Sequence, residues 1–418
     1  MLEGMSMSGT SLMALHRPPI RRWTGILACL GLLAAAGCGS SGGSSSAAGG
    51  TIKIGGICDL SGDLATFGNF CQESLQLAVH EANAGGGFTV DGQKEKFALT
   101  VDDGRSDPTA SVAAARNLVS EGVKYIFGPD TDNTSSQVLQ ATANSDVMEF
   151  AGGSADQAII GTAGHTLQFS VLQPNSLWQG AVLILLKKMG ITSGTIAIVY
   201  PSDVGQTIAP QFQSILTAAG YQAKVYLYPP TTTDFRSVLA RVKSANPAVV
   251  LQGYSVQQGL PITTTDLQLD VSKAVIGVGE TPAQVPAAIA KSQGSFPLVW
   301  GSMIAERSMD PTTTPQFEKF VRLWQGYFHQ SPNLAEAQTV IWFYDPVGML
   351  VKAMEKAGTV TDTKAIAKEL HSFTASHPYQ GALTDWYNSR NVIIRGSDIA
   401  VYKDGQSTWT YLPPTANS

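Results

Sequence analysis

The sequence predicts an α/β protein with two doubly wound lobes, each built on a parallel β-sheet, and three observations lead to this prediction. Short apolar runs alternate with helical patterns over most of the chain. Each apolar run is followed by a loop rich in Gly, Asp, Ser or Thr, which is typical of the βα units of parallel sheets. The units fall into two sets, and a chain of 418 residues that is 44% hydrophobic is long enough for two cores.

The first βα unit lies near the start of the folded region. Residues 52–57 carry three Ile with Lys and Gly between them, and they predict a strand that is buried for most of its length. The loop at 59–62, Asp-Leu-Ser-Gly, follows, and a helical pattern then covers about 67–84. Open parallel sheets bind ligands at the carboxyl ends of their strands, so this loop is a candidate wall of a ligand site.

The rest of the first set follows in the same order of elements. An Asp-Gly turn at residues 91–92 separates two extended segments, and Asp107 with Pro108 begins a helix that reaches about Glu121. The later elements are a strand at 124–127, a helix at 133–143 and a strand at 147–151.

A second set of units begins near Pro174. Its strands are predicted at 195–200, 221–227, 248–251 and 273–276. Its first helix ends near residue 189, and two further helices are predicted at 204–219 and 235–244. The chain is then mostly helical, at 317–328, 335–356 and 363–373, before short strands at 382–383 and 399–402. Repeated units of this kind favour a parallel sheet in each set.

The N-terminal segment predicts export. Basic residues precede an apolar run at 23–36 that is too short for a comfortable membrane span and is typical of a secretory signal. The run ends in Ala35-Ala36-Gly37-Cys38, which resembles the lipobox of bacterial lipoproteins, where the cysteine is acylated. We therefore expect a lipoprotein signal peptide at 1–37 and lipidation of Cys38. The alternative is a soluble secreted protein cut near Ala36.

A tether follows the predicted lipidation site. Residues 38–50 consist almost only of Gly, Ser and Ala after the cysteine, and such a composition forms a flexible linker with no core-forming side chains. The sequence therefore predicts a protein that is held at the extracytoplasmic side of the cell membrane by its N-terminal lipid.

The two cysteines of the folded part, Cys58 and Cys71, flank the first loop. One lies at the predicted strand end and the other at the helix start. In an oxidising compartment we expect them to form a disulfide. The alternative is two independent buried thiols, because sequence alone does not give their Cα separation.

Composition and motifs argue against several classes of protein. The formal net charge of −5 argues against a nucleic-acid partner, which usually leaves a basic patch. The chain has no Walker loop and no His-Glu-x-x-His, and its six histidines lack metal-ligand spacing. We therefore expect no catalysis, no cofactor and no metal site.

Several segments, taken in order, resemble the type I periplasmic binding proteins of the leucine/isoleucine/valine-binding branch, which serve ABC importers. The segments that carry the resemblance are Ile52-Lys53-Ile54-Gly55, Leu60-Ser61-Gly62, Phe67-Gly68, Asp102-Asp103, Asp107-Pro108, 122–128, 234–243 and 249–254. The resemblance implies two α/β lobes joined by three crossovers and closing on a ligand. It places residues 51–170 with 302–380 in lobe one, and 171–301 with 381–418 in lobe two.

The resemblance also implies ligand contacts in lobe one. In the family, an amino acid's carboxylate is held by hydroxyls and backbone N–H groups of the loops after the third and fourth strands. Here those loops supply Asp130, Thr131, Asp132, Gly152, Gly153 and Ser154. Ser154 matches a hydroxyl donor of the family, and the glycines let the main chain approach a ligand closely. Phe67 corresponds to an aromatic wall, although an aromatic here also suits a core position.

Asp132 departs from the family's pattern, which commonly has Ser at this position. A carboxylate beside a ligand carboxylate is repulsive. Either Asp132 turns away as a helix cap, or the ligand is not a plain α-amino acid.

Lobe two is implied to contribute three contacts. Val204 replaces an aromatic that the family often has, Tyr254 matches a pocket tyrosine, and Glu280 lies near the family's ammonium-binding acid. The alternative for Glu280 is a solvated loop carboxylate.

The predicted function is that of an extracytoplasmic receptor that delivers an amino acid or a related small polar molecule to an ABC permease. Ligand-induced closure of the lobes is the expected mechanism, and we expect a monomer. The alternative is a ligand-sensing regulatory lipoprotein on the same fold.

Overall fold

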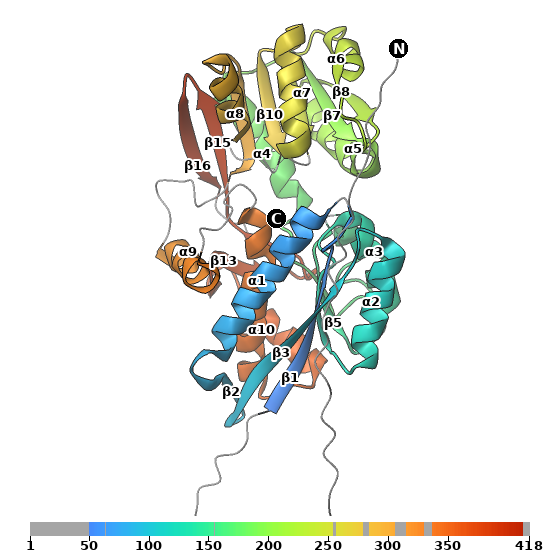
Figure 1. The fold of residues 1–418 in the computed structure, drawn as a ribbon, viewed down its shortest axis with the longest axis vertical. Helices are drawn as coiled ribbons and strands as arrows, with labels where there is room; N and C mark the ends of the chain where they lie inside the picture. The colour runs from blue at the N-terminus through green and yellow to red at the C-terminus, as the bar shows by residue number, and fades with distance from the viewer. Residues whose placement is uncertain are drawn as a thin grey trace, which may run out of the picture. The chain divides into compact units, whose positions relative to one another are not determined.

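The computed structural model describes residues 50–62, 64–153, 155–253, 256–278, 284–305, 315–329 and 337–412. Within these ranges, two large sheets of six and seven strands each organise one lobe (Figure 1). Both sheets are mainly parallel, so the predicted α/β fold class with two lobes is confirmed. Each lobe is described below by itself.

The first sheet has the strand order β2-β3-β1-β4-β5-β6. Its parallel strands are β1 (Gly50–Cys58), β3 (Gln93–Asp103), β4 (Tyr125–Phe127), β5 (Met148–Ala151) and β6 (Gln168–Ser170). The edge strand β2 (Phe88–Val90) pairs antiparallel with β3 across the Asp-Gly turn that the sequence predicts. Because β1 lies at the centre of this order, the loop that follows β1 has a neighbouring strand end on each side.

Helices cover both faces of the first sheet (Figure 1). The helices on one face are α1 (Ala65–Asn83), α9 (Pro315–Phe328), α10 (Ala337–Ala357) and α11 (Thr363–Leu370). Those on the other face are α2 (Pro108–Ser120) and α3 (Asp132–Thr142). Ile54 of β1 packs into the first of these cores and Ile57 into the second. The strand is therefore buried on both sides, as its apolar run predicts.

The second sheet has the order β16-β15-β11-β10-β9-β7-β8. Its parallel strands are β7 (Thr195–Pro201), β8 (Gln222–Tyr228), β9 (Val249–Gly253), β10 (Ala274–Val278) and β11 (Val299–Ala305). The antiparallel strands β15 (Ser397–Lys403) and β16 (Gln406–Leu412) extend one edge. Ile196 and Ile198 enter one core and Val199 enters the other, which again gives a strand buried on both faces.

Five helices of the described chain pack on the second sheet. They are α4 (Asn175–Lys188), α5 (Ser202–Ala218), α6 (Arg236–Lys243), α7 (Val256–Leu269) and α8 (Gln284–Gln293). In α6, Val238, Leu239 and Val242 are buried, in agreement with the one-sided apolar pattern of this segment.

The C-terminal region divides between the lobes at a different place from the one predicted. The sequence assigned all of 381–418 to lobe two. A small sheet of β12 (Tyr379–Gln380), β13 (Thr384–Tyr387) and β14 (Ile393–Arg395) instead contributes Ala382, Tyr387 and Ile393 to the core of the first lobe. Only the later strands β15 and β16 join the second sheet. Similarly, β11 keeps the chain in the second sheet up to Ala305.

Buried polar contacts explain why this small sheet stays with the first lobe. Asp345 of α10 accepts hydrogen bonds from the backbone N–H groups of Ala382 (2.6 Å) and Leu383 (2.8 Å). Arg395 donates two hydrogen bonds to the buried Asp385 (3.2 and 3.1 Å). This ion pair joins β13 to β14 within the small sheet, and breaking it would leave an uncompensated buried charge. The hydrogen bonds of Asp345 hold the small sheet against α10.

The predicted signal peptide and Cys38 lie outside the described residues, as does nearly all of the tether at 38–50. In the described part of the chain, no helix combines the length and the apolar character that crossing a membrane requires. Lipid anchoring therefore stays a prediction.

Candidate functional site

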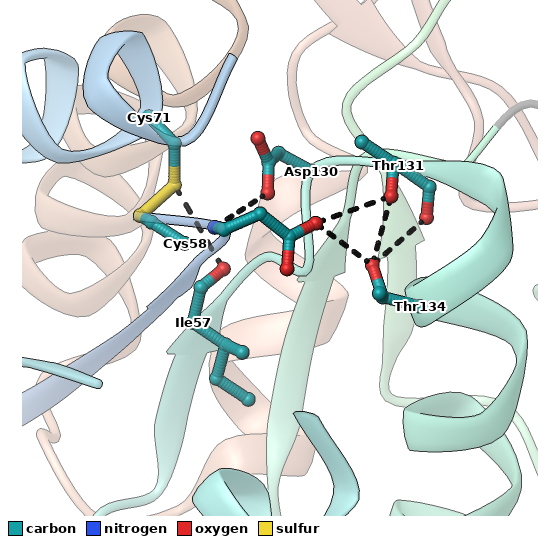
Figure 2. Close-up of a disulfide and its surroundings, with 7 residues drawn as sticks. Ile57, Cys58, Cys71, Asp130, Thr131 and Thr134 are labelled. Atoms are coloured by element: carbon teal, nitrogen blue, oxygen red, sulfur yellow. Dashed lines mark hydrogen bonds between the residues drawn. A yellow bond between two sulfur atoms is a disulfide. The ribbon is translucent and has the colours of Figure 1, made fainter. Parts of the chain in front are cut away.

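Three neighbouring strand ends create one polar edge in the first lobe. Strands β1, β4 and β5 are adjacent and parallel, with Gly56 paired to Phe127 and Phe127 paired to Phe150. The loops that follow these strands therefore lie side by side (Figure 2). These loops bring Asp59 into contact with the segment 128–131. Ligands of open parallel sheets bind at the carboxyl ends of the strands, which is where this contact lies.

Asp59, directly after β1, is the centre of this edge and is only 1% exposed. Its Oδ1 atom accepts a hydrogen bond from the backbone N–H of Ser106 (2.9 Å). Its Oδ2 atom accepts from the hydroxyls of Thr131 (3.3 Å) and Thr134 (3.4 Å). Burial raises the pKa of Asp59 and outweighs the three hydrogen bonds, which favour the charged form.

Asp130 lies beside Asp59 and is 5% exposed. Its Oδ1 atom accepts a hydrogen bond from the backbone N–H of Asp59 (3.2 Å), whereas its buried Oδ2 atom has no hydrogen-bond partner among the described residues. Burial, together with the charge of Asp59, raises the pKa of Asp130 to about 8. At neutral pH the Asp130 carboxyl is therefore mostly protonated. Figure 2 shows this carboxyl between the disulfide and Thr131, with one oxygen pointing beyond the end of β1.

Glycines on two adjacent loops fix the backbone at Asp130. The N–H of Gly152 donates to the carbonyl of Pro129 (2.8 Å), and a Cβ atom at Gly152 would lie 2.8 Å from the Cα atom of Asp130. Gly128 adopts a φ of 95°, which a residue with a side chain rarely does. The contact between the loops is therefore possible only because neither position carries a side chain.

The loop after β1 is also held on its other side. The backbone N–H and the hydroxyl of Ser61 donate to Asp103 at the end of β3 (3.1 and 2.7 Å). The hydroxyl of Ser106 donates to the carbonyl of Ser61 (2.9 Å). Burial raises the pKa of Asp103, but the hydrogen bonds from Ser61 and from the backbone N–H of Arg105 together outweigh burial and lower this pKa below its usual value. The wall that the sequence predicts at 59–62 is thus tied to two neighbouring loops.

Cys58 and Cys71 form a disulfide in the structure, with a Cα–Cα separation of 5.7 Å. The bond joins the last residue of β1 to α1, and Figure 2 shows it next to Asp130. Phe67, which is half-buried, lies in α1 within the segment that the bond closes. The covalent link therefore limits movement of α1 relative to Asp59.

The structure brings several of the predicted ligand contacts to this edge and leaves others untested. Asp130, Thr131, Gly152 and Gly153 lie on the two adjacent loops, and all four are buried. Outside the described residues are Ser154, Tyr254 and Glu280, together with the side chains of Asp132 and Val204. Their contact with a ligand remains a prediction.

The capping role considered for Asp132 does not match the helix boundary. Helix α3 begins at Asp132, so the N-cap position belongs to Thr131. The side chain of Thr131 forms no cap hydrogen bond, because its hydroxyl bonds to Asp59 and to the Thr134 hydroxyl. An acidic residue in the first turn of a helix is nevertheless favourable next to the helix dipole.

Sequence reasoning missed Asp59 and Thr134 as members of the site. Asp59 followed a strand directly, which is a usable signal, but an acidic residue there equally suits an ordinary turn. Thr134 was part of a predicted helix, and its inward orientation depends on contacts with a loop 75 residues away. Neither the burial of the acid nor the convergence of its donors is visible in the sequence.

The edge offers acceptors and carries no compensating cation in the described structure. Each ion pair found among the described residues involves other acids, and neither Asp59 nor Asp130 takes part in one. Within the same residues, no group of His, Cys, Asp and Glu side chains is arranged to hold a metal ion. The arrangement is chemically suited to hydrogen bonding with a polar ligand.

Known proteins resemble this chain in sequence and in fold. The Leu/Ile/Val-binding protein homolog 7 of Brucella suis is 26% identical over 289 residues, which is 67% of this chain and 71% of the relative. The fold matches the branched-chain amino acid transporter substrate binding protein LivJ of Streptococcus pneumoniae, solved with isoleucine. That match has a TM-score of 0.69 at 18% identity and covers 87% of this chain and 100% of LivJ.

A solute binding protein of an ABC transporter from R. palustris, solved with benzoate, has the same fold. Its TM-score is 0.68 at 15% identity, and the match covers 88% of this chain and 98% of that protein. A sequence model described as periplasmic binding protein matches residues 51–406, which is well over half of the chain. The chain therefore belongs to the periplasmic binding protein family.

Proposed function

We propose that this chain is an extracytoplasmic solute receptor that delivers an amino acid or a related small polar molecule to an ABC importer. The observation that carries the proposal is the polar edge formed by the loops after β1, β4 and β5. Membership of the periplasmic binding protein family and the Leu/Ile/Val-binding relative support it.

In the proposed mechanism, a ligand stabilises the form in which the lobes are closed, because it makes additional contacts there. The first lobe contributes Asp130, Thr131, Gly152 and Gly153, with Ser154 and Asp132 as further predicted contacts and Phe67 as a wall. The second lobe contributes Val204, Tyr254 and Glu280. The closed form is then the one that the permease binds.

The receptor is proposed to be held at the membrane by a lipid on Cys38 and to act as a monomer. The tether at 38–50 would give the folded lobes freedom to reach a permease in the same membrane. Metabolic labelling with a fatty acid tests the anchor. Label should enter the wild-type chain and should be absent from a Cys38→Ala variant, and label in both would contradict lipidation at Cys38.

Thermal-shift screening of amino acids, amides and small carboxylates tests the receptor function. A ligand that binds only the folded chain raises its melting temperature, and the rise continues to grow as the ligand concentration increases above Kd. We expect at least one of these solutes to raise the melting temperature in a concentration-dependent way. If no solute of these classes raises it at millimolar concentration, the proposed ligand class is wrong.

A further inference from the structure

The Oδ2 atom of Asp130 is a buried hydrogen-bonding atom that the described protein does not satisfy. The residue is 5% exposed, and the other carboxyl oxygen is already bonded to the N–H of Asp59. A buried polar atom without a partner is costly, and in native proteins such an atom calls for a specific explanation. A ligand group at the ends of β1 and β4 would supply the missing partner.

The hydroxyl donors of this edge are already occupied. Thr131 and Thr134 both turn inward, where each hydroxyl lies within hydrogen-bonding distance of the Asp59 carboxylate and of the other hydroxyl. A hydroxyl has a single hydrogen to donate. A carboxylate of the protein therefore takes these donors, including the Thr131 hydroxyl that the family resemblance offers to the carboxylate of a ligand.

The charge of the edge points in the same direction. Asp59 and Asp130 are joined by a hydrogen bond and form no ion pair with any described Lys or Arg. In the ionised form of Asp130, which a ligand ammonium favours, a ligand carboxylate would meet like charge, whereas an ammonium or amide N–H would meet an acceptor.

We propose that Asp130 determines specificity by accepting a hydrogen bond from an ammonium or amide group of the ligand, so that the first lobe selects amine- and amide-bearing solutes over simple carboxylates. This inference rests on the proposed receptor function and names its ligand class. It also separates this chain from the benzoate-bound structure of the same fold, whose ligand has no N–H group.

Matched probes that share a hydrocarbon skeleton test the inference directly. Calorimetric titration of the whole folded chain would compare isopentylamine, isocaproamide and isocaproate, and likewise benzylamine, benzamide and benzoate, with leucine as reference. At a pH above the pKa of Asp130, we expect the amines and amides to bind more tightly than the carboxylate of the same skeleton. Equal binding of the two classes, or tighter binding of the carboxylates, would overturn the inference while leaving the receptor function intact.

Asp130→Asn sharpens the same experiment at a pH where Asp130 is ionised, because the replacement then turns one acceptor oxygen into a donor nitrogen. The Asn carbonyl oxygen can still accept from the N–H of Asp59, which places an NH₂ donor where Oδ2 was. We expect amine and amide probes to lose about tenfold or more in affinity, since a hydrogen bond to a charged group is of that size. Carboxylate probes should lose nothing or gain. Unchanged affinity for the amines would overturn the inference.

Asp266→Asn provides a matched control. Asp266 is also buried, but both of its oxygens are bonded, to the N–H (3.1 Å) and hydroxyl (2.9 Å) of Ser272 before β10. Asp266 belongs to α7, and its bonds to Ser272 place it beside the amino end of β10 in the second sheet. Its replacement should leave the preference among the probes as in the wild type, and a change equal to that of Asp130→Asn would overturn the assignment to Asp130.

Failure of the inference and failure of the proposed function give different results. If only the carboxylate probes bind, the role inferred for Asp130 is wrong, but the proposed receptor function stands. Absence of binding by every probe and by every solute of the thermal screen removes the receptor function for small polar solutes, and the inference with it.

Discussion

The backbone N–H of Asp59 donates a hydrogen bond of 3.2 Å to the Oδ1 atom of Asp130, which joins two buried acids that are 71 residues apart in the chain. The bond connects the loops after β1 and β4 at the edge where this family of folds places its ligands. Because this bond fixes the Asp130 carboxyl relative to Asp59, substitution of either residue should change both the free energy of unfolding and the ligand affinity.

Stability should depend on pH through Asp130. Its pKa is about 8 in the folded chain and about 3.9 when unfolded, so the folded state binds the additional proton between these values. The contribution is complete below about pH 4 and is lost as the pH rises through 8. Asp130→Asn cannot titrate, so urea denaturation from pH 5 to 8 should show a smaller loss of stability for this variant, by up to about 1.4 kcal/mol per pH unit. Identical pH slopes for wild type and variant would contradict the raised pKa.

Binding of an amine should strengthen as the pH rises from 6 to about 8, because Asp130 accepts an N–H through Oδ2 only when that oxygen has no proton. Among the described side chains, the other ionisable groups near these strand ends are Asp59 and Asp103, and the exposed Arg105 follows β3. Titration of isopentylamine at several pH values measures the effect. We expect a gain of up to about tenfold per pH unit that levels off above the pKa. The Asp130→Asn variant should show a flat profile, and a steep one would assign the effect to another group.

Removing the donors to Asp59 should destabilise the first lobe. Thr131→Val or Thr134→Val deletes a hydroxyl that bonds to a buried carboxylate and should cost about 1–3 kcal/mol in free energy of unfolding. Thr217→Val, at an exposed position of α5, is the matched control and should change stability by less than about 0.5 kcal/mol. Equal effects at all three positions would argue against the network around Asp59.

The disulfide should stabilise both the fold and the ligand wall. Its two cysteines are 13 residues apart, and closing a loop of this size is worth about 3 kcal/mol in the chain-entropy estimate. The double variant Cys58→Ser with Cys71→Ser should lose stability of that order and bind its ligand more weakly. Wild-type protein treated with reductant should behave in the same way. If the reductant has no effect while the double variant is unstable, packing of the sulfur atoms and not the bond is responsible.

Gly152→Ala should disturb the site through the backbone of Asp130. The new methyl group would lie 2.8 Å from the Asp130 Cα atom, so one of the two loops must move. We expect lower stability and weaker ligand binding. Gly326→Ala is the control, because nothing lies within 4 Å of the added atom and alanine favours helix α9, so stability should rise by about 0.5–1 kcal/mol. A neutral Gly152→Ala would show that the two loops are not tightly packed.

Much of the fold follows from local patterns in the sequence. The run at 52–57 becomes a central strand because apolar side chains point into a core on each face, and α6 buries the face that its spacing predicts. The course of the chain after residue 380 could not be read in the same way. It depends on Asp345, whose bonds to Ala382 and Leu383 link segments that are far apart in sequence.

The candidate site was predictable only in part, for a related reason. The family resemblance pointed to the loops at 130–133 and 152–154, and the described parts of these two loops lie next to each other at the edge of the first sheet. Their contact with a ligand stays a prediction. The role of Asp59 depends on burial and on donors from two other loops, and an acidic residue after a strand carries no sign of either. The orientation of the Thr131 side chain likewise depends on its hydrogen bond to Asp59, which is 72 residues away in the chain.

A crystal structure with the tightest-binding solute of the thermal screen tests the central claim most directly. We predict that the solute lies at the loops after β1, β4 and β5, with an N–H group within hydrogen-bonding distance of Asp130 Oδ2. A solute bound at these loops with its carboxylate against Asp130, or bound elsewhere on the chain, would contradict this prediction.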